Sequence, residues 1–135
     1  MQKKPPVTWN LFTCELALST LARMKIDLLK AARAKSKVTY GELMKRYHLS
    51  RGRPLIRAIG QIDRLEYERG APGFAAIIVR RDTGFPGGGY FCDDDLPPEL
   101  RRISKSRTDP RLTLAEKDYV IVQQKRIWAH YAKTR

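Results

Sequence analysis

The sequence is poor in the residues that build metal centres, disulfides and membrane helices. It has two cysteines, Cys14 and Cys92, and two histidines, His48 and His130, among 135 residues. No paired spacing such as CxxC joins them, so the sequence predicts no metal site and no cofactor. No run approaches the roughly 18 apolar residues that a membrane span requires, and the N-terminus lacks an apolar leader. We therefore expect a cytoplasmic protein with reduced thiols and no membrane partner.

Acidic residues are also scarce relative to basic ones. The chain has 27 lysines and arginines against 14 aspartates and glutamates, which gives a net charge of +13 and a pI near 10.1. Such a surface attracts polyanions, because each phosphate that a Lys or Arg neutralises releases condensed counterions. We expect a nucleic acid as the partner, with an acidic protein as the alternative.

Apolar spacing predicts a single domain that has a long helix near each end. Apolar residues recur every three or four positions over residues 13–34, which is typical of an amphipathic helix. A capping box of Thr113 and Glu116 opens a last helix, 113–132, that we expect to pack on the first. We divide the chain into a basic, proline-containing arm (1–12), a central domain (13–92), and a loop with a C-terminal helix on the same domain (93–135).

Two shorter helices are predicted between them. Thr39 and Glu42 form a capping box that starts a helix over residues 39–47. Pro54 suits the first position of the next helix, 54–68, because its fixed φ matches the helical value.

Basic residues gather on and before the helix 54–68. Its apolar stripe leaves Arg57, Gln61 and Arg64 along the opposite side, beside Arg51 and Arg53. Arginine can pair with guanine in the major groove or enter a narrow minor groove as a cation. We expect this face to meet DNA; an ordinary solvated face is the alternative.

Residues 74–92 predict a β-hairpin. The β-branched run FAAIIVRR is followed by the turn-prone DTGFPGGG and then by YFC. Two helices and a hairpin in this order predict a winged helix-turn-helix, an α+β fold that is mainly α. Arg80 and Arg81 would reach the flanking groove, while Thr39 and Tyr40 would donate to a phosphate at the start of their helix.

Three short segments carry a resemblance to a known family. VTYGEL (38–43), RAIG (57–60) and GGY (88–90) follow in the order seen in the C-terminal DNA-binding domain of methylated-DNA alkyltransferases and in alkyltransferase-like proteins. The resemblance implies a winged helix-turn-helix, with Tyr40 beside the DNA backbone and Arg57 in the minor groove. The family's Pro-Cys-His-Arg segment is replaced here by residues 75–81, AAIIVRR, which cannot accept an alkyl group.

The predicted function is that of a non-enzymatic, winged-helix protein that binds double-stranded DNA, as a regulator or a binder of modified DNA. In a bacterial or phage setting it would associate with the nucleoid. One alternative is a small metal-dependent nuclease that uses the triple acid Asp93–Asp95, since carboxylates hold nuclease metals. A second alternative is a winged-helix module that binds another protein.

Overall fold

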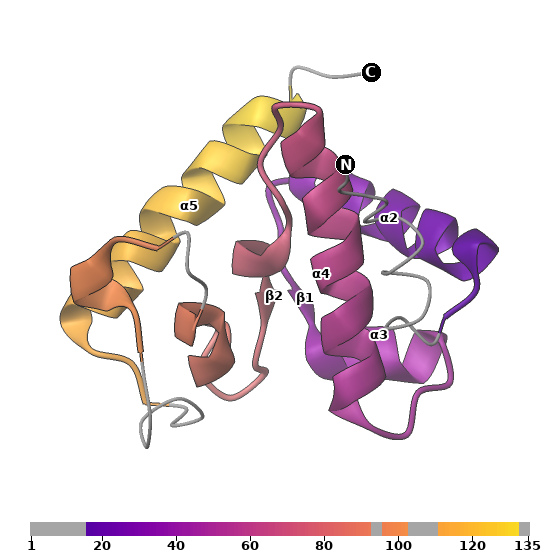
Figure 1. Cartoon of the computed structure of the whole chain (residues 1–135), viewed down its shortest axis with the longest axis horizontal. Coiled ribbons are helices and arrows are strands. Elements are labelled where there is room, and N and C mark those ends of the chain that lie inside the picture. The colour runs from indigo at the N-terminus through magenta and orange to yellow at the C-terminus, as the bar shows by residue number, and fades with distance from the viewer. Residues whose placement is uncertain (1–15, 93–95, 103–110, 133–135) are drawn as a thin grey trace, which may run out of the picture.

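Four α-helices and a two-stranded sheet form the framework of the part that the structure, a computed structural model, describes: residues 16–92, 96–102 and 111–132. Figure 1 shows their arrangement. The helices are α2 (Leu18–Arg33), α3 (Tyr40–Arg46), α4 (Gly52–Glu68) and α5 (Leu114–Ala132), and the strands are β1 (Val38–Thr39) and β2 (Ile78–Val79). Three short 3₁₀-helices complete it: η1 (Ala75–Ile77), η2 (Gly88–Cys92) and η3 (Pro98–Leu100). The prediction of an α+β protein that is mainly α is confirmed.

Helices α2 and α5 pack against each other, as the sequence predicted. The apolar spacing of α2 buries Leu21, Met24 and Leu28. The indole Nε1 of Trp128 in α5 donates to the carbonyl oxygen of Ser36, 3.0 Å away, just beyond the end of α2. In Figure 1 the C-terminal ends of α4 and α5 lie close together, and the two helices diverge from there.

The helix pair α3 and α4 also follows the sequence signals. Thr39 is the N-cap of α3: its Oγ1 accepts from the Glu42 amide at 3.0 Å, and the Glu42 Oε1 accepts from the Thr39 amide at 2.8 Å. Helix α4 begins at Gly52, two residues before the predicted start, and ends at Glu68 as predicted. The two helices are therefore joined by a five-residue connection, 47–51.

Residues 74–92 do not form the predicted hairpin, and the prediction of a hairpin wing is wrong. Strand β2 pairs in parallel with β1, with Val38 opposite Ile78. Every residue in the range Ile77–Val79 is buried. A strand without a solvent face suits the parallel pairing of strands that are covered on both sides, rather than an exposed hairpin.

After β2 the chain closes a tight loop instead of returning as a strand. The Arg80 amide donates to the Phe85 carbonyl and the Gly84 amide donates to the Arg80 carbonyl, both at 2.9 Å. Gly84 takes a φ of +74°, which glycine adopts without a steric penalty. The chain then continues as η2, where Phe91 is fully buried in a small second core with Leu96 and Val120.

Two predicted segments lie outside the described residues: the basic arm, 1–12, and the triple acid Asp93–Asp95.

None of the described helices combines the length and the apolar character needed to cross a membrane.

Candidate functional site

The start of α4 carries two exposed members of the predicted DNA-contacting set. Arg51, the N-cap, and Arg53 are both exposed, and the first turn contains no acidic residue and no side-chain cap. Arg57, one turn further on, is half-buried. The amide groups at this helix end and the two guanidinium groups together make it attractive to an anion.

The remaining two members of the predicted α4 face differ from expectation. Gln61 is buried, with 7% of its surface exposed, so the prediction that it faces a DNA groove is wrong. Arg64 is half-buried, and its Nε lies 3.9 Å from a carboxylate oxygen of Glu68. Arg57 and Arg64 are therefore the members of the predicted stripe that reach the surface, because α4 is rotated so that Gln61 turns towards the interior.

The side-chain oxygens of Thr39 and Tyr40 both accept hydrogen bonds within the fold. The hydroxyl oxygen of Thr39 serves as the cap of α3. The phenol oxygen of Tyr40 accepts a hydrogen bond from the Gly87 amide at 3.3 Å, and burial raises the pKa of this phenol. The Thr39 side chain thus holds the start of α3, and the Tyr40 side chain holds the loop after β2 beside it.

The loop over residues 80–87 presents two arginines in different states. Arg81 is exposed. Arg80 is half-buried and forms a two-pronged ion pair with Asp82, with Nε–Oδ1 at 2.9 Å and Nη2–Oδ2 at 2.7 Å. The hydrogen bond from Arg80 lowers the pKa of the Asp82 carboxyl, so the pair stays charged at neutral pH. An anion that binds Arg80 must compete with this carboxylate.

A second contact fixes the same loop from the other side. The Lys37 Nζ donates to the Gly84 carbonyl at 3.2 Å and lies 5.6 Å from the centre of the Phe85 ring. Together with the bond from Gly87 to Tyr40, this holds the loop against β1 and α3. Arg80 and Arg81 are therefore presented from a fixed loop, although it is not a hairpin.

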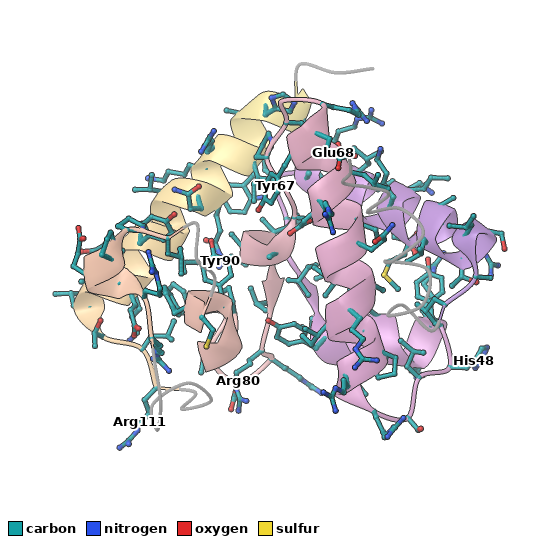
Figure 2. All side chains as sticks on the ribbon, in the orientation of Figure 1. His48, Tyr67, Glu68, Arg80, Tyr90 and Arg111 are labelled. Atoms are coloured by element: carbon teal, nitrogen blue, oxygen red, sulfur yellow. The ribbon has the colours of Figure 1, made fainter. Side chains whose placement is uncertain are left out.

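A cleft of about 1170 Å³ runs along one side of α4. Residues of α4 line one wall of the cleft, and residues of η2 and α5 line the opposite wall. Gly52 and Arg80 are also among the lining residues, so the cleft extends to the first turn of α4. Tyr67, Tyr90 and Tyr119 line it, and Figure 2 shows Tyr67 on α4 and Tyr90 on the opposite side. Tyr40 also lines the cleft, whereas Arg57 does not. The mixture of tyrosine rings and arginines is suited to a flat aromatic ligand with a negative charge nearby.

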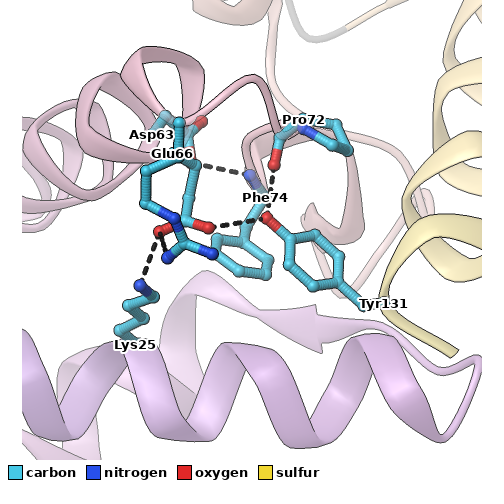
Figure 3. Close-up of polar contacts among 7 residues, drawn as sticks. Lys25, Asp63, Glu66, Pro72, Phe74 and Tyr131 are labelled. Atoms are coloured by element: carbon cyan, nitrogen blue, oxygen red, sulfur yellow. Dashed lines mark hydrogen bonds and ion pairs between the residues drawn. The ribbon is translucent and has the colours of Figure 1, made fainter. Parts of the chain in front are cut away.

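Two acidic residues of α4 that the sequence analysis did not single out are buried and serve packing. Figure 3 shows Glu66 between α2 and α5, where its Oε2 lies 2.6 Å from the Nζ of Lys25. Its Oε1 accepts from the Tyr131 hydroxyl at 3.0 Å, and burial, with the nearby Glu66 charge, raises the pKa of Tyr131. Asp63 accepts from the backbone amides of Phe74 and Ala75, at 2.6 and 3.2 Å. Both carboxylates are therefore engaged within the fold.

The described residues offer little for a metal ion. Within them no three Cys, His, Asp or Glu side chains come together in a way that would hold a metal. Cys92 is half-buried and lines the cleft. Asp93–Asp95, on which the nuclease alternative depends, cannot be placed, since they are outside the described ranges.

Known proteins do not identify this site. Comparison of the chain with protein families, with curated proteins and with solved structures finds no match. The likeness to alkyltransferase domains therefore stays a prediction from three short segments.

Proposed function

We propose that the chain binds double-stranded DNA without catalysing a reaction, as a winged-helix-like protein in which a fixed loop replaces the hairpin. The contact surface is the basic edge, which we define as Arg51, Arg53, Arg57, Arg80 and Arg81. The first turn of α4 would meet a groove, and the loop after β2 would touch the flanking backbone. The protein would act as a regulator or as a binder of modified DNA.

The exposed pair Arg51 and Arg53 at the start of α4 is the observation that carries this proposal. Neither side chain has a hydrogen-bond or ion-pair partner within the described ranges. Helix α3 precedes α4 in the order of a helix-turn-helix, in which the second helix is the one that enters the groove. The net charge of +13 adds a general attraction to phosphate.

Binding of a fluorescently labelled duplex, followed by anisotropy at several salt concentrations, tests the proposal. We expect affinity to fall steeply with salt: the logarithm of the association constant should fall with the logarithm of the salt concentration, with a slope of about 0.9 for each phosphate contacted. We call the magnitude of this slope the salt slope. The variant Arg51→Gln/Arg53→Gln should lower that slope by about two, because it removes two such contacts.

A matched control removes the same charge elsewhere. Lys35 and Lys125 are exposed and lie outside the basic edge, so Lys35→Gln/Lys125→Gln should change the slope less. Equal effects of the two double variants would mean that the charge of the whole chain, and not the start of α4, makes the contact. If no duplex is bound even at low salt, the DNA proposal is rejected and the protein-interaction alternative takes its place.

The cleft beside α4 supports a finer version of the proposal, in which the protein prefers DNA that contains a modified or unpaired nucleotide. Gly52 and Arg80, beside the basic edge, belong to the lining of the cleft, and base rings stack favourably on tyrosine. Tyr67 lies about 22 Å along α4 from Gly52, whereas Figure 2 shows Tyr90 nearer to Arg80. An extrahelical base would then leave the duplex at the basic edge and enter the cleft beside Tyr90.

A comparison of matched duplexes with duplexes that carry one mismatch tests this version. We expect tighter binding to the mismatched duplex and loss of that preference in Tyr90→Ala, since stacking on an aromatic ring contributes about 1–3 kcal/mol per base. Tyr90→Phe is the control, because it keeps the ring and removes only the hydroxyl. Equal affinity of the wild-type chain for both duplexes would reject the preference and leave plain duplex binding.

The nuclease alternative has a direct test. The protein is incubated with plasmid and Mg²⁺ or Mn²⁺, and the same assay is repeated with Asp94→Ala. Cleavage that disappears in the variant would replace the non-enzymatic proposal with a metal-dependent one.

A further inference from the structure

A second hollow, of about 670 Å³, lies between α2 and the end of α3, and its lining is mainly polar and charged. We call it the α2–α3 pocket and define it by Arg23, Asp27, Lys30, Arg46, Tyr47 and His48. Figure 2 places His48 on the other side of the lower end of α4 from Arg80. The pocket is therefore separate from the basic edge and from the cleft.

Positive charge exceeds negative charge in this pocket. Arg23 and Lys30 are seven residues apart on α2, so two turns bring them to the same side of the helix. Both are exposed, and neither side chain has a hydrogen bond or ion pair within the described ranges. Arg46 supplies a third cation from the end of α3, and Asp27 is the single carboxylate among the pocket's lining residues.

The carboxylate of Asp27 is already engaged. Its Oδ2 lies 2.9 Å from the Nε of Arg46 and also accepts from the Tyr47 hydroxyl. Burial and the bond to Asp27 raise the pKa of Tyr47, so this hydroxyl keeps its proton and remains a donor. Asp27 thus orients the guanidinium of Arg46 and neutralises it, which leaves Arg23 and Lys30 as an excess of two positive charges.

His48 supplies a further donor at an unusual backbone position. It has a φ of +58° at the end of α3, where the Leu49 amide donates to the Met44 carbonyl at 2.8 Å. Glycine is the usual residue at such a helix end, because it adopts positive φ without steric cost. The chain instead places an imidazole there, whose N–H can donate to an oxygen acceptor.

We propose that the α2–α3 pocket binds a phosphate group. A phosphate carries negative charge and several acceptor oxygens, which match guanidinium, ammonium and imidazole donors around one hollow. The group could belong to the backbone of a duplex that contacts α4, in which case the inference rests on the proposed function, since the helix before a recognition helix crosses the backbone. It could equally belong to a small phosphorylated molecule.

Titration of the ¹⁵N-labelled full chain with inorganic phosphate, at constant ionic strength, tests the pocket itself. We expect saturable NMR shifts at the Arg46 Nε–H and the His48 amide. Arg23→Gln/Lys30→Gln should weaken phosphate binding by about tenfold or more, whereas the control Lys35→Gln/Lys125→Gln, with the same loss of charge, should leave it within about twofold. Shifts that do not saturate, or equal weakening in both variants, would overturn the proposal.

Duplex binding by the same variants distinguishes the two sources of phosphate. If the pocket holds the DNA backbone, Arg23→Gln/Lys30→Gln lowers the salt slope of duplex binding by about two, more than the control does. If phosphate saturates the pocket and the two variants have equal slopes, the ligand is a small phosphorylated molecule. Saturable phosphate binding without duplex binding would reject the DNA function and keep the pocket. Duplex binding with no saturable phosphate shift and with equal slopes would reject the pocket alone.

Discussion

Replacement of Gly73 by alanine should destabilise the protein strongly, because the added methyl group has no room. A Cβ at this position would lie 2.3 Å from the Asp63 Cγ and 2.6 Å from its Oδ2. Asp63 cannot move away without loss, since its two oxygens accept from the amides of Phe74 and Ala75. It is also buried, with 6% of its surface exposed.

The size of the effect follows from these contacts. Overpacking of a filled interior costs about 1–3 kcal/mol, and a hydrogen bond to a charged acceptor contributes about 1.5–3 kcal/mol. We expect Gly73→Ala to lower the free energy of unfolding by about 3–5 kcal/mol, given partial retention of the two bonds. For a domain of this size each kcal/mol lowers Tm by about 3–6 °C.

Urea and thermal unfolding, followed by circular dichroism, measure this change against a control in the same helix as Asp63. A Cβ built at Gly60 meets no atom within 4 Å, and this position is exposed inside α4. Gly60→Ala should therefore stabilise the protein by up to about 1 kcal/mol, because alanine has the higher helix propensity. The same substitution thus has opposite signs at two sites.

The Asp63→Gly background isolates the cause. A Cβ at Gly73 would also lie 2.7 Å from the Asp63 Cβ, so the whole side chain must be removed to abolish the clash. Gly73→Ala should then cost less than about 1 kcal/mol more in that background. The reasoning is refuted if Gly73→Ala is as stable as the wild type, or if its cost is unchanged in the Asp63→Gly background.

Two further predictions concern ion pairs. Asp82→Asn should tighten duplex binding severalfold and steepen its salt dependence, because it frees the Arg80 guanidinium from its ion pair. Asp118→Asn, which makes the same charge change on α5, should have a smaller effect. Equal increases in duplex affinity in the anisotropy assay would exclude competition at Arg80. Arg102→Met should lower the free energy of unfolding by about 3–5 kcal/mol in urea titrations, because it leaves the nearly buried Glu116 carboxylate without its two-pronged partner. Arg102 holds the pKa of Glu116 below its usual value, so the stability from this pair is present above the unfolded pKa and is lost as the pH falls through the folded one. The wild type should therefore lose more stability on acidification than Arg102→Met, and parallel pH profiles would contradict this.

The helices could be predicted from the sequence because their signals are local. The capping boxes at Thr39 and Thr113 form as predicted, with reciprocal hydrogen bonds to Glu42 and Glu116. Such contacts depend on residues three positions apart, so no tertiary information is needed to find them.

The orientation of α4 could not be predicted in the same way. Apolar residues cover much of its circumference, so the pattern did not specify which edge faces the core: Ile56 is 56% exposed, whereas Gln61 is buried. Glu66 is fully buried although it is acidic, and it continues the helical spacing of Ile59 and Ile62. Arg69, three positions on, is a local partner of this carboxylate at 3.4 Å, but it is exposed. The partners that reach Glu66 from other helices, Lys25 and Tyr131, are not revealed by any local pattern.

The sequence contains a pattern that argues against the predicted hairpin. The run from Phe74 to Val79 contains no alternation of polar and apolar residues, which argues against a strand with one solvent face. Such a run is typical of a strand that is covered on both sides, and β2 is one. Its partner β1 lies about 40 residues earlier, so local turn residues could not reveal the pairing.

The buried carboxylate of Glu66 connects α4 with α2 and α5, and this has a consequence for folding during synthesis. Its charge is covered by Arg69, just beyond the end of α4, by Lys25, from the first described helix, and by Tyr131, from the last. A nascent chain that has released α2 and α4 from the ribosome still holds a carboxylate without its hydroxyl donor, and it cannot complete its interior until α5 emerges. Fragments that stop before α5 should therefore be short-lived in cells, and a chain that includes α5 should acquire protease resistance in a single step once that helix has emerged.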